Sequence, residues 1–146
     1  MATNTIIQYL ESGNGVATSH RSQVETFIAA ETIAANDLVS LDLSQAIDGD
    51  KSLKITKADT GTATDTCAIG FALNGGAAGD KIDVTVAGIH ISANVNGAVV
   101  AGSKLCAGAT AGQAAIYVNT DVLPIVAISA EADTANVATV FVIKQF

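Results

Sequence analysis

Residues 81–93 read Lys-Ile-Asp-Val-Thr-Val-Ala-Gly-Ile-His-Ile-Ser-Ala, and this stretch decides the fold class. Apolar residues at 82, 84 and 86 alternate with polar ones, and the alternation resumes around His90. Successive side chains of a strand point to opposite faces, so a period of two predicts β structure with one buried face.

Short apolar runs of the same kind recur along the chain, separated by turn residues. Asp48-Gly49 and Asn96-Gly97 are dipeptides typical of tight hairpins. Short strands separated by frequent turn signals predict an all-β domain, as a compact antiparallel β-barrel or sandwich. The alanine-rich residues 129–135 are expected to form a loop or one helical turn. Strands are expected at residues 24–30, 38–41, 53–56, 67–73, 82–86, 89–93, 103–107, 115–118, 123–129 and 138–143.

The same order of elements occurs in both halves of the chain. Residues 34–39 (AANDLV) resemble residues 100–105 (VAGSKL), and residues 69–73 correspond to residues 125–129. Two copies are too few for a solenoid, but they fit a pseudo-symmetric barrel or two facing sheets. An internal pseudo-repeat competes here with chance similarity, because the chain is rich in Ala, Gly and Val.

The composition is that of one ordinary domain. The chain has 146 residues, of which 49% are hydrophobic and only 4% aromatic, with no Trp. Such a chain folds without a disulfide or metal, around a core of small and β-branched side chains. Thirteen Gly against one Pro indicate many turns and no disordered linker.

Residues 1–25 differ from the rest, because they are polar and contain no sustained period. We expect an extended N-terminal arm, followed by a single β domain at residues 26–146. The arm carries one apolar cluster that must be buried, either on its own domain or on a neighbouring subunit or partner. The expected anchors of this interaction are Ile6, Ile7, Tyr9 and Leu10.

The charge balance is acidic, with 7 Lys and Arg against 14 Asp and Glu. This balance argues against nucleic-acid binding and against docking on an anionic membrane. The N-terminus has no basic start followed by an apolar run, and no stretch is long enough for a membrane helix. We therefore expect synthesis in a cytoplasm, with no nucleic-acid or membrane partner.

Residues that carry chemistry are few and scattered. His20 and His90 lie in no metal-binding motif, and His90 is expected to be an exposed strand residue. Cys67 and Cys106 have no CxxC spacing and are expected to be buried free thiols. Asp48-Gly49-Asp50 lacks the further ligands of a calcium loop. We therefore expect no catalytic, metal or cofactor site, and no enzyme.

Three blocks of residues carry a resemblance to a known family. Residues 34–39, 67–73 and 77–84 are similar to blocks of the capsid decoration (cement) proteins of tailed bacteriophages, and the resemblance covers about residues 30–146. The family pattern has Gly where this chain has Asn36. Asn tolerates the left-handed backbone better than other non-Gly residues, so the turn is expected to survive.

The resemblance implies a compact β domain, often trimeric, that sits on the outside of a phage head and clamps neighbouring major capsid protein subunits. It also implies a terminal arm in some members. The expected partners are therefore the major capsid protein and two further copies of the chain, and the expected location is the virion. The alternatives are a host-glycan-binding fibre or adhesin module, another virion structural protein, an enzyme accessory domain of the β-clip kind, and a bacterial shell or surface-layer subunit.

Overall fold

The computed structural model describes residues 22–60, 67–118 and 123–145, and their regular secondary structure is β strand apart from one helical turn. The predicted all-β fold class is confirmed. In chain order the elements are β1 (Gln23–Ala29), β2 (Leu38–Leu41), α2 (Asp48–Lys51), β3 (Lys54–Lys57), β4 (Ala68–Ala72), β5 (Lys81–Asn96), β6 (Lys104–Ala107), β7 (Ala114–Ile116), β8 (Ala127–Ser129) and β9 (Val137–Val142).

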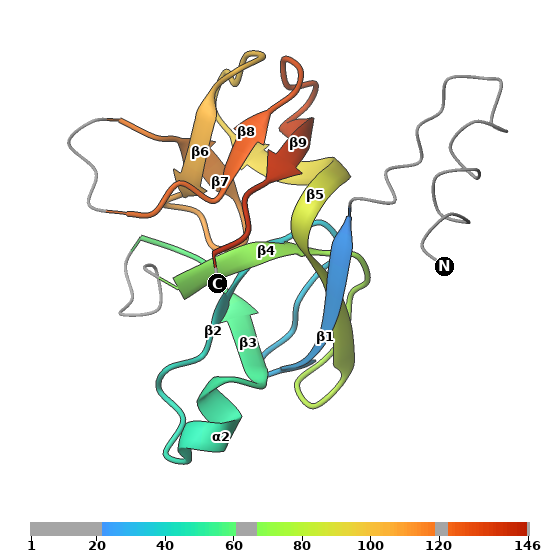
Figure 1. Cartoon of the computed structure of the whole chain (residues 1–146), viewed down its shortest axis with the longest axis vertical. Helices are drawn as coiled ribbons and strands as arrows, with labels where there is room; N and C mark the ends of the chain where they lie inside the picture. Colours follow the sequence, from blue (N-terminus) through green and yellow to red (C-terminus); the bar gives the residue numbers. More distant parts are fainter. Residues whose placement is uncertain (1–21, 61–66, 119–122, 146) are drawn as a thin grey trace, which may run out of the picture.

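The strands form two closed barrels that share β5. The sheet order is β1-β3-β2-β4-β5-β7-β6-β8-β9, and β5 also pairs with β1 and with β9. The first half of β5 therefore closes a first barrel with β1–β4, and its second half closes a second barrel with β6–β9. Figure 1 shows the second barrel standing above β4, with α2 at the far end of the first barrel. Closure leaves neither barrel with a free sheet edge.

The two barrels have the same connectivity, which confirms the internal pseudo-repeat. β1 pairs with β3 in parallel and with β5 antiparallel, and the second half of β5 pairs in the same two ways with β7 and β9. β2 pairs antiparallel with β3 and β4, as β6 does with β7 and β8. The second barrel thus repeats the first, strand for strand.

The turn before β2 recurs before β6 with the same hydrogen bonds. Asn36 N–H donates to the Ala72 carbonyl at 2.7 Å, and Gly102 N–H donates to the Ser129 carbonyl at 2.8 Å. The backbone is left-handed at both positions, with φ of 72° at Asn36 and 84° at Gly102. Asn36 thus adopts the left-handed backbone that was expected at this turn.

Two hydrophobic clusters fill the barrels. The first lies inside the first barrel and includes Phe27, Ile55 and Val84. The second lies inside the second barrel, but it also takes in Leu38 and Phe71 from β2 and β4 of the first barrel. Both faces of β4 are consequently covered, and all five of its residues are buried.

Three local predictions were wrong. Asp48-Gly49 forms no hairpin, because it begins the single helical turn α2. The acids Asp48 and Asp50 lie toward the N-terminal end of this turn, and Lys51 lies at its C-terminal end. Asn96-Gly97 ends β5, but β6 pairs with β7 and β8 instead of β5. The two-residue hairpin turn is Ala135-Asn136, with φ of 52° and 64°. Leu53 was expected to share a buried face with Ile55, but it precedes β3 and is exposed.

Candidate interaction surfaces

The polar residues of the described segments form no metal-binding cluster of three or more His, Cys, Asp or Glu. No helix within these segments is long and apolar enough to cross a membrane. Cys67 and Cys106 are not joined by a disulfide, as expected, although Cys67 is only half-buried. The candidate functional sites among the described residues therefore lie mainly on the outer surfaces of the two barrels.

The prediction for His90 was wrong, because its side chain is only 3% exposed. Its ring stacks on Phe71 of the first barrel, with ring centroids 5.4 Å apart. Nδ1 lies 3.2 Å from Thr85 Oγ1, and Nε2 lies 3.2 Å from Asn36 Oδ1. His90 therefore joins the two barrels through one ring contact and two hydrogen bonds.

The surroundings of His90 select its neutral form. Asn36 Oδ1 is an acceptor, so Nε2 carries the proton and donates, while Nδ1 accepts from the Thr85 hydroxyl. Burial lowers the pKa of His90 from 6.5 to about 4. The residue that could have indicated the burial of His90 is Gly88, which has φ of 92° where β5 passes from one barrel to the other. The alternation of buried residues is not continuous across that point.

One row of side chains on the outside of the first barrel is covered by the second barrel. Leu38 pairs with Phe71, Phe71 with Thr85, and Thr85 with Val24, so the four side chains lie side by side across β2, β4, β5 and β1. Leu38, Phe71 and Thr85 are at most 1% exposed. Val24, at the end of the row, is 46% exposed. We name Leu38, Phe71 and Thr85 the covered row.

The pseudo-repeat places an equivalent row on the second barrel. Lys104 pairs with Ile128, Ile128 with Phe141, and Phe141 with Ile89, across β6, β8, β9 and β5. We name this set the open row, because nothing in the described chain covers it as the second barrel covers the first row. Phe141 is 48% exposed, and Ile128 and Ile89 are half-buried.

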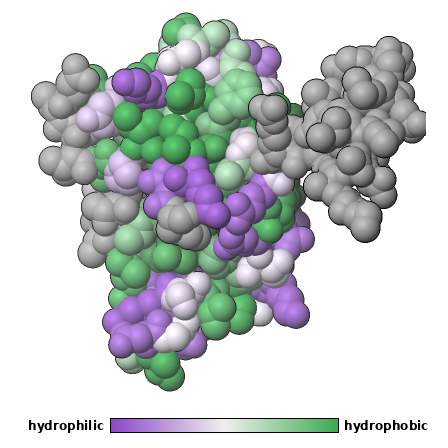
Figure 2. Space-filling view, viewed as in Figure 1, coloured by the Kyte–Doolittle hydropathy of each residue, from purple (hydrophilic) through white to green (hydrophobic). Residues whose placement is uncertain are grey.

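Two further apolar side chains extend the open row into a surface patch. Ile91 lies two residues after Ile89 and is 74% exposed. Ile143 lies two residues after Phe141 and is 39% exposed. Figure 2 shows a broad hydrophobic area over the second barrel, above a hydrophilic band. Contiguous apolar surface of this kind marks interaction sites on soluble proteins. The patch is a candidate docking surface.

A second exposed apolar group lies at the far end of the first barrel, on the β2–β3 connection (residues 42–53). Leu43, Ile47 and Leu53 are 41%, 66% and 51% exposed. Figure 2 shows hydrophobic atoms at the lower tip of the molecule, where Figure 1 places α2. This connection is the second candidate surface.

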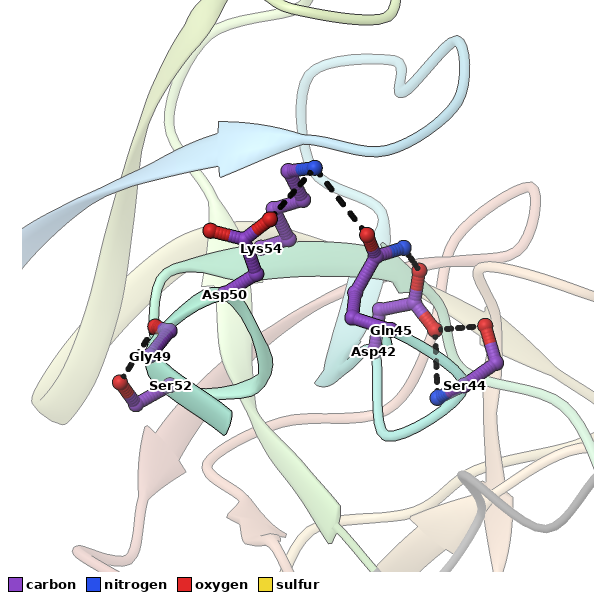
Figure 3. A network of polar contacts seen from close by, with 7 residues as sticks. All are labelled: Asp42, Ser44, Gln45, Gly49, Asp50, Ser52 and Lys54. Atoms are coloured by element: carbon purple, nitrogen blue, oxygen red, sulfur yellow. Dashed lines mark hydrogen bonds and ion pairs between the residues drawn. The ribbon is translucent and has the colours of Figure 1, made fainter. Parts of the chain in front are cut away.

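A polar network holds the β2–β3 connection in shape (Figure 3). Asp42 Oδ1 accepts hydrogen bonds from Ser44 N–H at 3.0 Å and from Ser44 Oγ at 2.6 Å. Gln45 bridges the Asp42 carboxylate and Lys54 Nζ, which also pairs with Asp50 at 3.1 Å. Burial raises the pKa of Asp42, but hydrogen bonds from Ser44 and Gln45 outweigh it and hold the pKa below its ordinary value.

A pocket beside this network has little to hold a ligand. Its lining consists of Ile28, Ala29, Ala30, Ala78 and Gly79, together with Gln45 and Lys54. Both polar side chains are already bonded to the network. The network therefore serves to fix the connection.

The expected arm anchors Ile6, Ile7, Tyr9 and Leu10 lie outside the described residues. Strand β1 begins at Gln23, so residues 23–25 of the expected arm belong to the first barrel. The described chain starts next to the open row, where Ser22 Oγ donates to the Ile89 carbonyl at 3.2 Å. The N-terminal segment is thus joined to the molecule beside the patch.

Comparison with known proteins gives a structural relative but no family. No protein-family model matches the chain, and no curated protein matches it. Among solved structures, the chain is similar to the N base of the head fiber gp8.5 of bacteriophage phi29, with a TM-score of 0.57 and 16% sequence identity. The match covers 84% of this chain and 94% of that one. At this identity, the likeness shows that the two chains share a fold.

Proposed function

We propose that this chain is a structural protein of a phage virion that attaches to the head. The observation that carries the proposal is the fold shared with the base of a phage head fiber over 84% of the chain. The sequence supports it independently, because the blocks that resemble phage decoration proteins form the turn before β2 and the β4–β5 hairpin. Fold alone does not determine function, so these two lines of support are needed together.

The finer proposal is a capsid decoration protein. It binds the outer surface of the head as a homotrimer, stabilises contacts between major capsid protein subunits, and acts by binding instead of catalysis. A ligand that binds only the assembled shell stabilises it by about 2.7 kcal/mol per site at a hundredfold excess over Kd. Many sites on one particle would multiply this effect. The net charge of −7 fits a partner that is neither nucleic acid nor an anionic membrane.

The test uses phage heads that lack the protein. We expect the full chain to co-sediment with expanded heads and to raise the temperature at which the heads break open. Replacing Ile6, Ile7, Tyr9 and Leu10 by Ser should abolish binding if the arm anchors the protein. The matched control replaces four polar residues of the same segment, Thr3, Asn4, Gln8 and Ser12, by Ala and should bind normally.

A second candidate, the base of a head fibre, is favoured by the same structural relative. A fibre base that contacts a single capsid subunit would bind that subunit equally well before and after the shell breaks, and so would not raise the breaking temperature. One experiment therefore separates the two functions. Failure to bind heads, together with binding to host glycans on an array, would overturn both and favour the adhesin alternative.

A further inference from the structure

The pseudo-repeat shows what kind of surface covers a row of this type. In the first barrel, the row of Leu38, Phe71 and Thr85 is covered by one end of the second barrel. The β6–β7 connection (residues 108–113) reaches the start of this row, where Leu38 N–H donates to the Gly112 carbonyl at 2.7 Å. Gly112 N–H in turn donates to the Ala58 carbonyl at 2.9 Å. The rest of the row is covered by β5, because the His90 ring stacks on Phe71 and its Nδ1 lies 3.2 Å from Thr85 Oγ1. The cover is therefore one end of the second barrel, with the β6–β7 connection at Leu38 and His90 at Phe71 and Thr85.

This internal contact is head-to-tail. The first barrel uses the outer face of β2, β4 and β5, whereas the second barrel uses its end. If the second barrel had used its own equivalent row, Lys104, Ile128 and Phe141 would be buried in the contact, but Lys104 and Phe141 are exposed. A contact between two different surfaces leaves one of each unused. Among residues 22–60, 67–118 and 123–145, the unused pair is the open row and the end of the first barrel.

The unused end is the β2–β3 connection, the topological equivalent of the β6–β7 connection. Both join a strand to its antiparallel neighbour at the same place in the barrel. The β6–β7 connection is short, whereas the β2–β3 connection is longer and includes α2. It also carries the exposed side chains Leu43, Ile47 and Leu53. Apolar groups are thus exposed on both members of the unused pair.

We propose that the open row and its flanking Ile91 and Ile143 bind the β2–β3 connection of a second copy of this chain. The contact between copies would repeat the contact that the two barrels make within one copy. Because it joins different surfaces, each copy both offers a connection and accepts one, and a closed ring follows when the rotation between copies closes.

Charge complementarity favours this occupant. The β2–β3 connection contains three acids, Asp42, Asp48 and Asp50, against one base, Lys51. Two lysines lie on the patch, Lys104 within the open row and Lys144 next to Ile143. The Asp48 side chain is 94% exposed and pairs with Lys51 of its own connection at 2.8 Å, so a lysine of a second copy would share that carboxylate. Opposite charges around an apolar centre favour the head-to-tail orientation over patch-to-patch pairing, which would bring lysines together.

The backbone at the start of the open row has the same hydrogen bonding as the backbone at the contact between the two barrels. The carbonyl of Lys104 accepts a hydrogen bond from Tyr117 N–H at 2.8 Å, as the carbonyl of Leu38 does from Ala58 N–H at 3.0 Å. The backbone at the start of the open row is therefore built like the backbone that Gly112 contacts. This inference deepens the proposed homotrimer, on which it rests, but it does not depend on what the protein binds on a virion. Failure of self-association would overturn the inference and the homotrimer, whereas failure to bind heads would overturn only the attachment to the virion.

The experiment measures the mass of the full chain in solution by sedimentation equilibrium over a range of concentrations. The wild type should form an oligomer. Two variants at the patch, Phe141→Asp and Ile91→Asp, and one at the connection, Ile47→Asp, should each be monomeric. The matched controls are Val100→Asp and Leu73→Asp, which place a charge on exposed apolar residues outside both surfaces and should associate like the wild type. Circular dichroism checks that each variant is folded.

Mixing the variants gives the decisive result. Phe141→Asp retains its connection and Ile47→Asp retains its patch, so an equimolar mixture should form a 1:1 dimer and nothing larger. A wild-type chain that stays monomeric at all concentrations would overturn the proposal. An Ile47→Asp variant that associates like the wild type would overturn it too, because that result indicates patch-to-patch pairing.

Discussion

The first and second barrels have the same strand pairings, yet they treat equivalent surfaces differently. On the first barrel, Leu38 and Phe71 lie outside the barrel wall but are completely buried, because the second barrel stands on them. On the second barrel, the equivalent Ile128 and its neighbour Phe141 keep apolar side chains in contact with solvent. The difference shows that apolar side chains on the outer face recur in both units, and that among the described residues only the first unit has its row covered.

The largest effect that separates the two rows is expected from truncating their central side chains. Phe71→Ala should lower the free energy of unfolding by about 3–5 kcal/mol, because it leaves a cavity between the barrels. Ile128→Ala, at the equivalent position, should cost about 1–2 kcal/mol, since that side chain is only half-buried. Urea unfolding at a concentration where the chain is monomeric measures both. Equal costs would mean that the two rows do not differ in burial.

A pH titration tests the contact that covers the first row. The pKa of His90 is about 4 in the folded chain against 6.5 unfolded, so the unfolded chain binds more protons between these values. Stability should therefore fall as the pH drops from 7 to 4, by on the order of 2–3 kcal/mol. The measurement is the urea midpoint across this range.

The His90→Gln variant isolates this contribution. Other groups also titrate, including Asp42, whose lowered pKa makes its contribution to stability fall away in acid. The difference between the wild-type and His90→Gln curves removes such shared terms, and it should shrink steadily from pH 7 to 4. A difference that stays constant with pH would show that His90 has the same pKa in the folded and unfolded chains, and therefore that the contact between the barrels does not lower it.

The alternation of residues predicted strands at 82–86 and 89–93, which the structure joins into the single strand β5. The similarity of residues 34–39 to residues 100–105 indicated a repeat but left chance similarity open, and the strand pairings decide for the repeat. Both predictions depend on local patterns that survive in the fold. The burial of His90 was beyond such patterns, because it depends on β5 leaving one barrel at Gly88 and entering the other. The open row was missed for the same reason, since Ile128 and Phe141 are apolar residues in strands and burial is their default.

The smallest expected change in the free energy of unfolding comes from substitutions in the turns before β2 and β6. The sign of this change distinguishes backbone preference from loss of a hydrogen bond. Asn36→Gly installs the residue that the second barrel has at Gly102, in a backbone with φ of 72°. Backbone preference alone predicts that Gly stabilises a left-handed position, by up to about 1 kcal/mol. Asn36 Oδ1, however, accepts the Nε2 proton of the buried His90. Removing it leaves that donor unpaired, at a cost of about 1–3 kcal/mol.

We therefore expect Asn36→Gly to destabilise the chain by a net amount of about 1 kcal/mol, measured by urea unfolding at pH 7. In a His90→Phe background the donor is gone, so the same substitution should become neutral or stabilising. The reciprocal Gly102→Asn change places a side chain in open space and should cost only the backbone strain. If Asn36→Gly is stabilising in both backgrounds, the hydrogen bond to His90 contributes nothing. The presence of Asn at residue 36 and Gly at residue 102 would then make no difference to how the two barrels are joined.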